Sequence, residues 1–369
     1  MAVKRKFIST RLLKEGMKID QAIVDSTGRS LIEKGAYLDD FHIEYLQGKG
    51  IGGIYIQEGE PDPDELNEIE MQIPQYTREV IEKNRVADRA KVQLTESVRQ
   101  RVGEGIQFLY NNTDSENFSE ATNNVANELM KTIVDNDAVA VDISMLKVSD
   151  EYTFKHSVDV ATMAMIIGKK YGLDDRDIHD LGISGLLHDV GKSKIPNEVL
   201  NKAGRLTDEE FALMKQHTLL GFEILKKRNE FSDGIMRGVL QHHEKTNGKG
   251  YPLGNNADKI HLYAKIISVA DIYDALVTER PYKSGFPKGV AIEMIMAMTG
   301  ELDFDAMKSF LSTVILYPVD SIIQLSNGEK AKVIENNTEN CLRPRVVGLK
   351  TGKIYDLAND VGCASLIIQ

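Results

Sequence analysis

Two pairs of adjacent residues in this sequence could hold metal ions: His188-Asp189, within LLHDVGKSKIP, and His242-His243, within QHHEKTNGKGYP. Neutral imidazole nitrogens and carboxylate oxygens are ligands that borderline divalent metals take in proteins. Six of the eight histidines lie between His156 and His243. If the two pairs converge, the centre has more ligands than one ion needs, which indicates two-metal chemistry on a phosphate ester.

The surroundings of the first pair favour this chemistry. On a helix, His188 and Asp189 would lie about 100° apart, so both could reach a site across the helix end. A bridging Asp189 carboxylate would let two cations lie close together. Lys192, four residues after His188, would share its face and could bind a substrate phosphate. Gly191 and Pro196 are expected to end the helix.

Three further residues complete the ligand set by type: His156, His217 and Asp271. Asp271 lies in the apolar segment SVADIYDAL, where a carboxylate is costly to bury unless it is paired or binds a metal. Asp274 is better suited to a hydrogen bond with a ligand imidazole. Taken singly, each histidine could be a packed or surface residue and Asp271 a structural one, but their joint occurrence indicates a site. The histidines interpreted as having no role are His42, His179 and His261.

The segment after His243 predicts a tight, exposed turn. Residues 247–252 read NGKGYP, and two glycines with a proline are not compatible with a helix. Beside the metals, this turn could position a substrate and offer the ring of Tyr251 for stacking. The alternative is a simple connection between two helices, which would not need this composition.

The rest of the chain predicts a mainly α-helical protein with small appendages. Residues 1 to about 60 alternate short apolar runs with turn signals, as in a small α+β module. The chain is strongly helical from 150 to about 316, with Thr207 as an N-cap and Gly172 at a helix end. After Pro318 the pattern alternates around Asn-Gly and Thr-Gly turns, which indicates a β-rich C-terminal appendage.

Residues 76–110 are expected to contain one long amphipathic helix, in EVIEKNRVADRAKVQLTESVRQRVGEGIQFL. Such a helix could form the seam of a homodimer. The alternative is a packed helix that joins two domains.

Composition limits the classes of function. The net charge of −11 argues against a protein that coats a nucleic acid polymer or an anionic membrane. Only two cysteines occur, far from the histidines, so thiolate ligation is not expected. The N-terminus does not resemble a signal peptide, and no apolar run is long enough to span a membrane. A cytoplasmic location is expected.

The motifs HDVGK and HHEKTNGKGYP, with YTFKHS, KQH and VADIYDALVTERPYK, resemble the HD-GYP family of bacterial metal-dependent phosphohydrolases. The resemblance covers roughly residues 125–320. It implies an HD-type helical bundle at 125–320. The sequence pattern adds an α+β module at 1–66 and a helical linker at 67–124 before this bundle, and the β-rich appendage at 321–369 after it. Partners in signalling are expected as well.

The resemblance also assigns roles to residues of this chain. It implies metal ligation by His156, His188, Asp189, His217, His242, His243 and Asp271. It implies that Asp189 and Lys192 serve catalysis, with Lys192 assisting the phosphate chemistry. The residues implied to contact substrate are Lys192, Gly250, Tyr251, Pro252, Arg280 and Lys283.

The family usually hydrolyses cyclic di-GMP to pGpG, and in some members on to GMP, by attack of a metal-bridging hydroxide on phosphorus. Two divalent ions, iron or manganese, are expected as cofactors. Two alternatives stay open: a low-turnover receptor for cyclic dinucleotides, and a phosphodiesterase for 3′,3′-cyclic GMP-AMP.

The sequence departs from the family pattern at two positions. Asn247 stands where the signature loop often has Asp, a change that is expected to keep the turn. Tyr152 stands four residues before His156, where some members have a Glu that helps to hold a third metal. Tyrosine is a poor replacement, and Glu151 is not expected to take that role. We therefore expect two ions rather than three.

Overall fold

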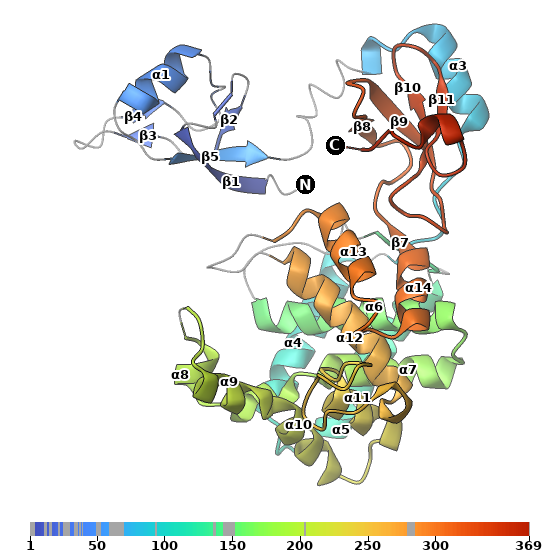
Figure 1. The fold of residues 1–369 in the computed structure, drawn as a ribbon. Helices are drawn as coiled ribbons and strands as arrows, with labels where there is room; N and C mark the ends of the chain where they lie inside the picture. The colour runs from blue at the N-terminus through green and yellow to red at the C-terminus, as the bar shows by residue number, and fades with distance from the viewer. Residues whose placement is uncertain are drawn as a thin grey trace. The chain divides into compact units, whose positions relative to one another are not determined.

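The computed structural model describes residues 4–10, 13–14, 17–20, 23–24, 30–32, 36, 38, 40–48, 53–58, 70–92, 94–135, 138–142, 152–202, 204–278 and 285–368. Its contacts divide the chain into two compact units, Met1–Ile73 and Pro74–Gln369. The protein is mainly α-helical, as the sequence predicts (Figure 1).

In its described residues, the first unit combines short strands with the helix α1. Three strands form an antiparallel sheet in the order β1-β5-β2, and β3 pairs with β4. The core of this unit includes Ile19, Leu38, Leu46 and Ile56, all buried. The elements are β1 (Lys4–Ser9), β2 (Lys18–Ile19), β3 (Ile23–Val24), β4 (Ser30–Ile32), α1 (Asp40–Gly48) and β5 (Gly53–Glu58).

The second unit is built mainly from helices. They are α3 (Gln75–Asn84), α4 (Glu96–Asn111), α5 (Phe118–Asp135), α6 (Tyr152–Tyr171), α7 (Asp175–Leu187), η2 (Val190–Lys194), α8 (Asn197–Leu200), α9 (Asp208–Lys215), α10 (His217–Lys226), α11 (Asp233–Gln241), η3 (Ala257–Lys259), α12 (Leu262–Val277), α13 (Lys288–Ala297) and α14 (Phe304–Thr313).

Helix α6 lies at the centre of this bundle and packs against α4, α7, α12 and α14 (Figure 1). Residues 157–168 of α6 are all buried, so the helix has no solvent-facing side along this stretch. A helix that is apolar on every side is one that neighbours surround. Gly172, at a φ of 100°, ends the segment, as predicted. The helix therefore forms a rigid support for any residue at its N-terminal end.

The predicted long helix within residues 76–110 is wrong. The structure has two helices, α3 and α4, and the described residues between them, 85–92 and 94–95, are not helical. These residues make backbone hydrogen bonds to partners distant in sequence, from Val86 N to Ile334 O and from Val92 N to Ala140 O. The Thr95 side chain then caps α4. Long-range pairing of the backbone outweighs local helical propensity here.

Both helices are packed rather than free. Buried Thr77 and Ile81 face a C-terminal sheet from α3, whereas α4 buries Val102 and Ile106 in the helical core. The segment therefore fits the alternative of packed connecting helices.

The C-terminal appendage is a four-stranded antiparallel sheet in the order β11-β10-β9-β8. Gly328 and Gly352, in the predicted turns, have φ values of 83° and 64°, which favour glycine. The strands of this sheet are β8 (Ile322–Gln324), β9 (Lys330–Glu335), β10 (Arg345–Gly348) and β11 (Ile354–Asp356), and η4 (Val361–Cys363) follows them. A separate pair of parallel strands is formed by β6 (Val141–Asp142) and β7 (Val314–Ile315). Among the described helices, none is long and apolar enough to cross a membrane.

Candidate metal centre

The structure brings together the side chains of all seven predicted metal ligands. They come from α6, from the α7–η2 junction, from the start of α10, from the end of α11, and from the middle of α12. Asp189 lies at the centre, 4% exposed, at the N-cap of η2. Helix ends meet at this point, so short side chains can converge without long reach.

Glycines let the elements approach closely enough. A Cβ at Gly191 would lie 1.9 Å from the carbonyl oxygen of His217 and 2.5 Å from the amide of Gly221. A Cβ at Gly185 would lie 2.8 Å from the Cα of Ala161, on α6. No larger residue fits either contact unless the backbone shifts, so the glycines set the spacing of η2, α10 and α6.

The two oxygens of Asp189 face two different groups of histidines. Oδ2 lies 3.3 Å from His188 Nε2 and 3.8 Å from His156 Nε2. Oδ1 lies 3.4 Å from His217 Nε2 and 4.0 Å from His242 Nε2. The potential ligand atoms form two clusters, each within 4.8 Å, and Asp189 belongs to both. One carboxylate is thus placed to bridge two sites.

Three imidazoles are held with Nε2 free for a metal. The Nδ1 atoms of His188, His217 and His242 lie 2.7–2.8 Å from the carbonyl oxygens of Gly185, Met214 and Val239, respectively. A carbonyl only accepts, so each Nδ1 must donate its proton and each Nε2 keeps its lone pair. This arrangement is typical of histidines that bind metals.

The groups present fit divalent cations. His156 Nε2 and His188 Nε2 are 3.2 Å apart, and His217 Nε2 and His242 Nε2 are 3.3 Å apart. Two lone pairs at these distances repel unless a proton or cation lies near both. Within the described part of the chain, buried Asp189 Oδ1 also has no hydrogen-bond partner. A buried carboxylate oxygen without a partner is costly, and a metal ion would satisfy it.

Asp271 completes the centre from α12. Its Oδ1 lies 3.2 Å from His156 Nε2, and its Oδ2 lies 3.9 Å from His243 Nδ1, so it reaches a member of each cluster. Asp274, one helical turn away, accepts a 2.6 Å hydrogen bond from His156 Nδ1, as predicted. This contact orients the imidazole toward the centre.

Burial and charge move the pKa values of these groups apart. Burial opposes a charge on His156, but the carboxylates of Asp271 and Asp274 outweigh it and raise the pKa of this imidazole to about 10. Burial lowers the pKa of His243 to about 4, and lowers that of His242 well below its usual value. Burial opposes the charge of Asp189 too, yet Lys192 and the histidines keep its pKa well below the usual range. Perturbations of this kind are typical of functional sites.

Lys192 and Tyr251 lie at the edge of the centre. Lys192 Nζ donates a 2.5 Å hydrogen bond to Asp189 Oδ2, and its side chain is 29% exposed. The ring of Tyr251 lies 4.7 Å from that of His243, at an interplanar angle of 32°. Both therefore lie where a bound substrate could contact them.

The turn that carries Tyr251 is held by a residue that the sequence reasoning missed. Glu244 is 3% exposed and accepts hydrogen bonds from the amides of Leu253 and Asn255, at 2.7 and 2.9 Å. Gly250 allows a close approach, since a Cβ there would lie 2.3 Å from the Lys245 amide. The sequence signal that could have identified Glu244 was its position directly after His242-His243.

The structure does not describe every predicted site residue. Arg280 and Lys283 lie outside the described residues, as does Glu151. Tyr152 begins α6, but the described structure gives no environment for its side chain. None of His42, His179 and His261 belongs to either ligand cluster among the described residues, and His261 caps α12 by accepting from the Tyr263 amide.

Comparison with known proteins places this centre in a family. The sequence profile described as "HD domain" matches residues 140–307, which include all seven predicted ligands. Residues 140–307 of this chain are therefore similar to HD domains, and the motifs around the ligands resemble those of the HD-GYP type.

Several curated relatives match this HD domain. The chain is 34% identical over 222 residues to the cyclic di-GMP phosphodiesterase PA4108 of Pseudomonas aeruginosa, which covers 60% of this chain and 54% of that protein. It is 36% identical over 167 residues to a cyclic di-GMP phosphodiesterase of Thermotoga maritima, covering 43% and 45%. It is 40% identical over 143 residues to 3′3′-cGAMP-specific phosphodiesterase 3 of Vibrio cholerae, covering 38% and 31%. The matches span about half or less of these relatives.

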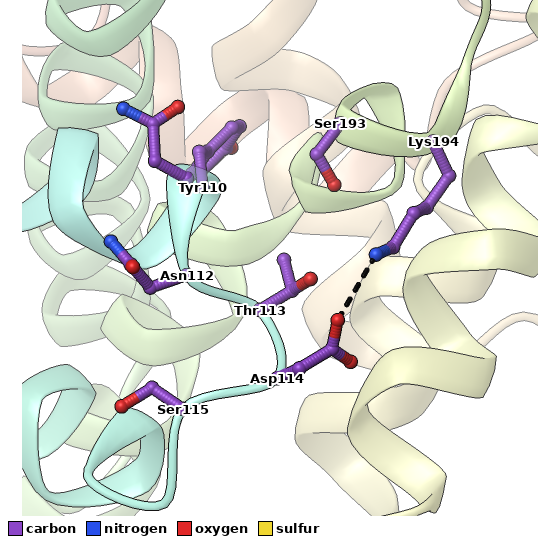
Figure 2. A pocket seen from close by; sticks show the side chains of 8 residues that line it. Tyr110, Asn112, Thr113, Asp114, Ser115, Ser193 and Lys194 are labelled. Atoms are coloured by element: carbon purple, nitrogen blue, oxygen red, sulfur yellow. Dashed lines mark hydrogen bonds and ion pairs between the residues drawn. The ribbon is translucent and has the colours of Figure 1, made fainter.

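A separate cavity of about 300 Å³ adjoins the far end of η2 (Figure 2). It is lined by residues 110–115 and by Ser193 and Lys194, and Lys194 pairs with Asp114 at 3.4 Å. The Tyr110 hydroxyl donates to the Leu186 carbonyl, so this ring closes one side of the cavity. None of the seven predicted metal ligands lines this cavity.

Proposed function

We propose that this protein is a metal-dependent phosphodiesterase in the cytoplasm that hydrolyses cyclic di-GMP, with either pGpG or GMP as the end product. The observation that carries the proposal is Asp189, whose two oxygens face separate groups of histidines. One carboxylate shared by two nitrogen-rich sites is typical of two-metal hydrolysis of phosphate esters. The names of the relatives supply the substrate class.

Seven residues would hold the ions. His156, His188 and Asp189 would form one site, and His217, His242 and His243 the other, with Asp189 and Asp271 reaching both. The mixed nitrogen and oxygen set suits two ions of iron or manganese. Such ions supply a water of lowered pKa and stabilise negative charge on the phosphate.

The protein's own groups would position the substrate and its charge. Lys192, already beside Asp189, would donate to an oxygen of the reacting phosphate, where charge increases in the transition state. Tyr251, with Gly250 and Pro252, would form a wall against the substrate. Arg280 and Lys283 would hold the second phosphate. Aspartates and histidines that are already oriented need no reorganisation during the reaction.

The test is hydrolysis of cyclic di-GMP by protein purified without air and loaded with iron or manganese. Asp189→Asn removes one charge from the centre and should lower kcat by at least about a thousandfold, the size of effect typical of lost transition-state stabilisation. Asp305→Asn, in the first turn of α14 and exposed, is the matched control and should leave kcat unchanged. Full activity of Asp189→Asn, or no turnover of the wild type with either metal, contradicts the proposal.

A second candidate substrate is 3′,3′-cyclic GMP-AMP, because one relative is named for that activity. Both cyclic dinucleotides supplied together at equal concentration, with products separated by chromatography, measure the ratio of kcat/KM directly. A preference for the mixed dinucleotide would replace cyclic di-GMP as the substrate and leave the metal centre as proposed.

A homodimer through residues 76–110 stays a prediction. Its apolar side chains that remain exposed are Tyr76, Val86 and Phe108. Light scattering of wild type and of Phe108→Ser tests it, since a dimer seam at α4 should weaken in the variant.

A further inference from the structure

An exposed phenylalanine and a half-buried lysine lie on one face of α9, outside the core. Phe211 and Lys215 are four residues apart, so they share a face of the helix. No residue of α9 is buried, and Phe211 is 47% exposed. The Lys215 Nζ lies 5.2 Å from the centre of the Phe211 ring. A cation over an aromatic face is held in place by the electrons of the ring.

This face of α9 adjoins the metal centre. The same Nζ lies 6.0 Å from the centre of the Tyr251 ring, which in turn lies 4.7 Å from the His243 ring. The Tyr251 ring is also 6.3 Å from the ring of His217. Two successive contacts therefore connect Lys215 to a histidine of the centre.

Among the described residues, the charge of Lys215 has no carboxylate partner. Within the described part of the chain, no carboxylate lies within 4.0 Å of its Nζ. Other lysines nearby are paired, Lys202 with Glu210 and Lys192 with Asp189. Contact with ring faces leaves the N–H groups of Lys215 without acceptors, so they can donate to an incoming ligand.

We infer that Lys215 is a substrate-positioning residue that binds a hydrogen-bond acceptor of the dinucleotide beyond the reacting phosphate, with Phe211 holding its side chain beside the Tyr251 ring. This inference rests on the proposed function. The acceptor is either an oxygen of the second phosphate or the O6 and N7 edge of a guanine, which both accept from an ammonium. Because Lys215 does not reach the metal ligands, its contribution is to binding rather than to the chemical step.

The experiment compares Lys215→Met with Lys226→Met in the full, metal-loaded chain. Lys226 rests on the ring of Phe222 at 5.6 Å, in the same kind of contact. It lies nine residues after His217 on α10, about 13 Å along the helix. Lys215→Met should raise the KM for cyclic di-GMP about tenfold, with kcat changed less than twofold, the loss of one charge-assisted hydrogen bond. Lys226→Met should change neither.

Bis(4-nitrophenyl) phosphate, a diester without bases or a second phosphate, reports the metal centre by itself. Its turnover should be equal in wild type and Lys215→Met. An unchanged KM for cyclic di-GMP in Lys215→Met overturns the inference, and so do equal losses on both substrates, which would indicate damage to the centre. Wild type that cleaves this diester but neither binds nor cleaves cyclic di-GMP refutes the proposed substrate, and the inference with it.

Cyclic di-AMP separates the two acceptors. Adenine lacks O6 and presents an amino group there, so a guanine contact predicts a larger rise in KM or Kd for cyclic di-GMP than for cyclic di-AMP. A phosphate contact predicts equal rises. Both results support the role of Lys215.

Discussion

Gly191→Ala should dismantle one half of the metal centre. The added Cβ would lie 1.9 Å from the His217 carbonyl oxygen, whereas unstrained heavy atoms approach to roughly 3.5 Å. The atoms must therefore separate by roughly 1.5 Å, and both sides of the contact are backbone. Metal–nitrogen distances tolerate only about 0.2 Å, so His217 and Asp189 could no longer share an ion.

We expect the metal content of Gly191→Ala to fall from about two ions per chain to about one. Stability should fall by about 1–3 kcal/mol, the usual cost of overpacking. The assays are metal analysis by mass spectrometry after anaerobic purification, urea unfolding, and hydrolysis of cyclic di-GMP. Turnover should be lost even where the protein remains folded, because the shared site is broken.

Gly103→Ala is the matched control. Gly103 lies within α4, and an added Cβ there meets no atom within 4 Å. It should keep both ions and gain up to about 1 kcal/mol, because alanine favours a helix over glycine. Gly191→Ala with two ions, wild-type activity and wild-type stability would refute the reasoning about backbone contact.

Three further predictions concern the groups around the ligands. Asp274→Asn should weaken metal affinity about 10- to 100-fold, measured by competition with a chelator, because His156 loses its charged partner; unchanged affinity would contradict this role. Glu244→Gln should cost about 1–3 kcal/mol in urea unfolding and raise the KM, because each carboxylate oxygen accepts from a different turn amide and glutamine would place an NH2 donor against one of these amides. The exposed control Glu301→Gln should cost less than about 1 kcal/mol. In metal-free protein, the pKa of His243 is lowered to about 4. Between about pH 6.5 and 4, this imidazole binds a proton in the unfolded chain but not in the folded one. The free energy of unfolding should therefore fall as the pH drops over this range, by at most about 1.4 kcal/mol per pH unit. An unfolding free energy that does not change over that pH range would refute the lowered pKa of His243.

The sequence predicted the residues of the centre better than their arrangement. The types and spacing of the histidines, with Asp271 on an apolar helix, were sufficient to select the side chains that converge. The role of Gly191 was interpreted only as a helix end, because a contact with α10 depends on packing that is distant in sequence. Glu244 was missed for the same reason, since its partners are amides of the following turn.

The wrong prediction over residues 76–110 has a similar origin. The residues from 85 to 95 have a helical pattern, yet their amides find partners at Ala140 and Ile334. A local sequence pattern shows helical propensity and the position of an apolar face. It does not show a backbone hydrogen bond to a residue more than forty positions away. Local patterns were sufficient for α6, where a long run of mostly apolar residues is buried among neighbouring helices.

A common local geometry explains which histidines point to the centre. His188 and His242 follow directly after α7 and α11, and His217 follows α9 by two residues. The last carbonyls of a helix have no amide partner within it, so the Nδ1 of a histidine placed there can donate to a carbonyl three residues back. With Nδ1 bonded back to its own helix, Nε2 on the opposite side of the ring points outward, here toward Asp189.

His156 departs from this geometry for a reason that supports the same argument. His156 lies inside α6, where the backbone carbonyls already accept from helix amides, so its Nδ1 needs a side-chain acceptor. Asp274 supplies it from α12, at 2.6 Å. His179 lies inside α7, outside both clusters, and among the described residues its Nε2 is buried without a partner. A histidine just after a helix is therefore a better candidate ligand than one within a helix, unless a carboxylate on a neighbouring helix can orient it.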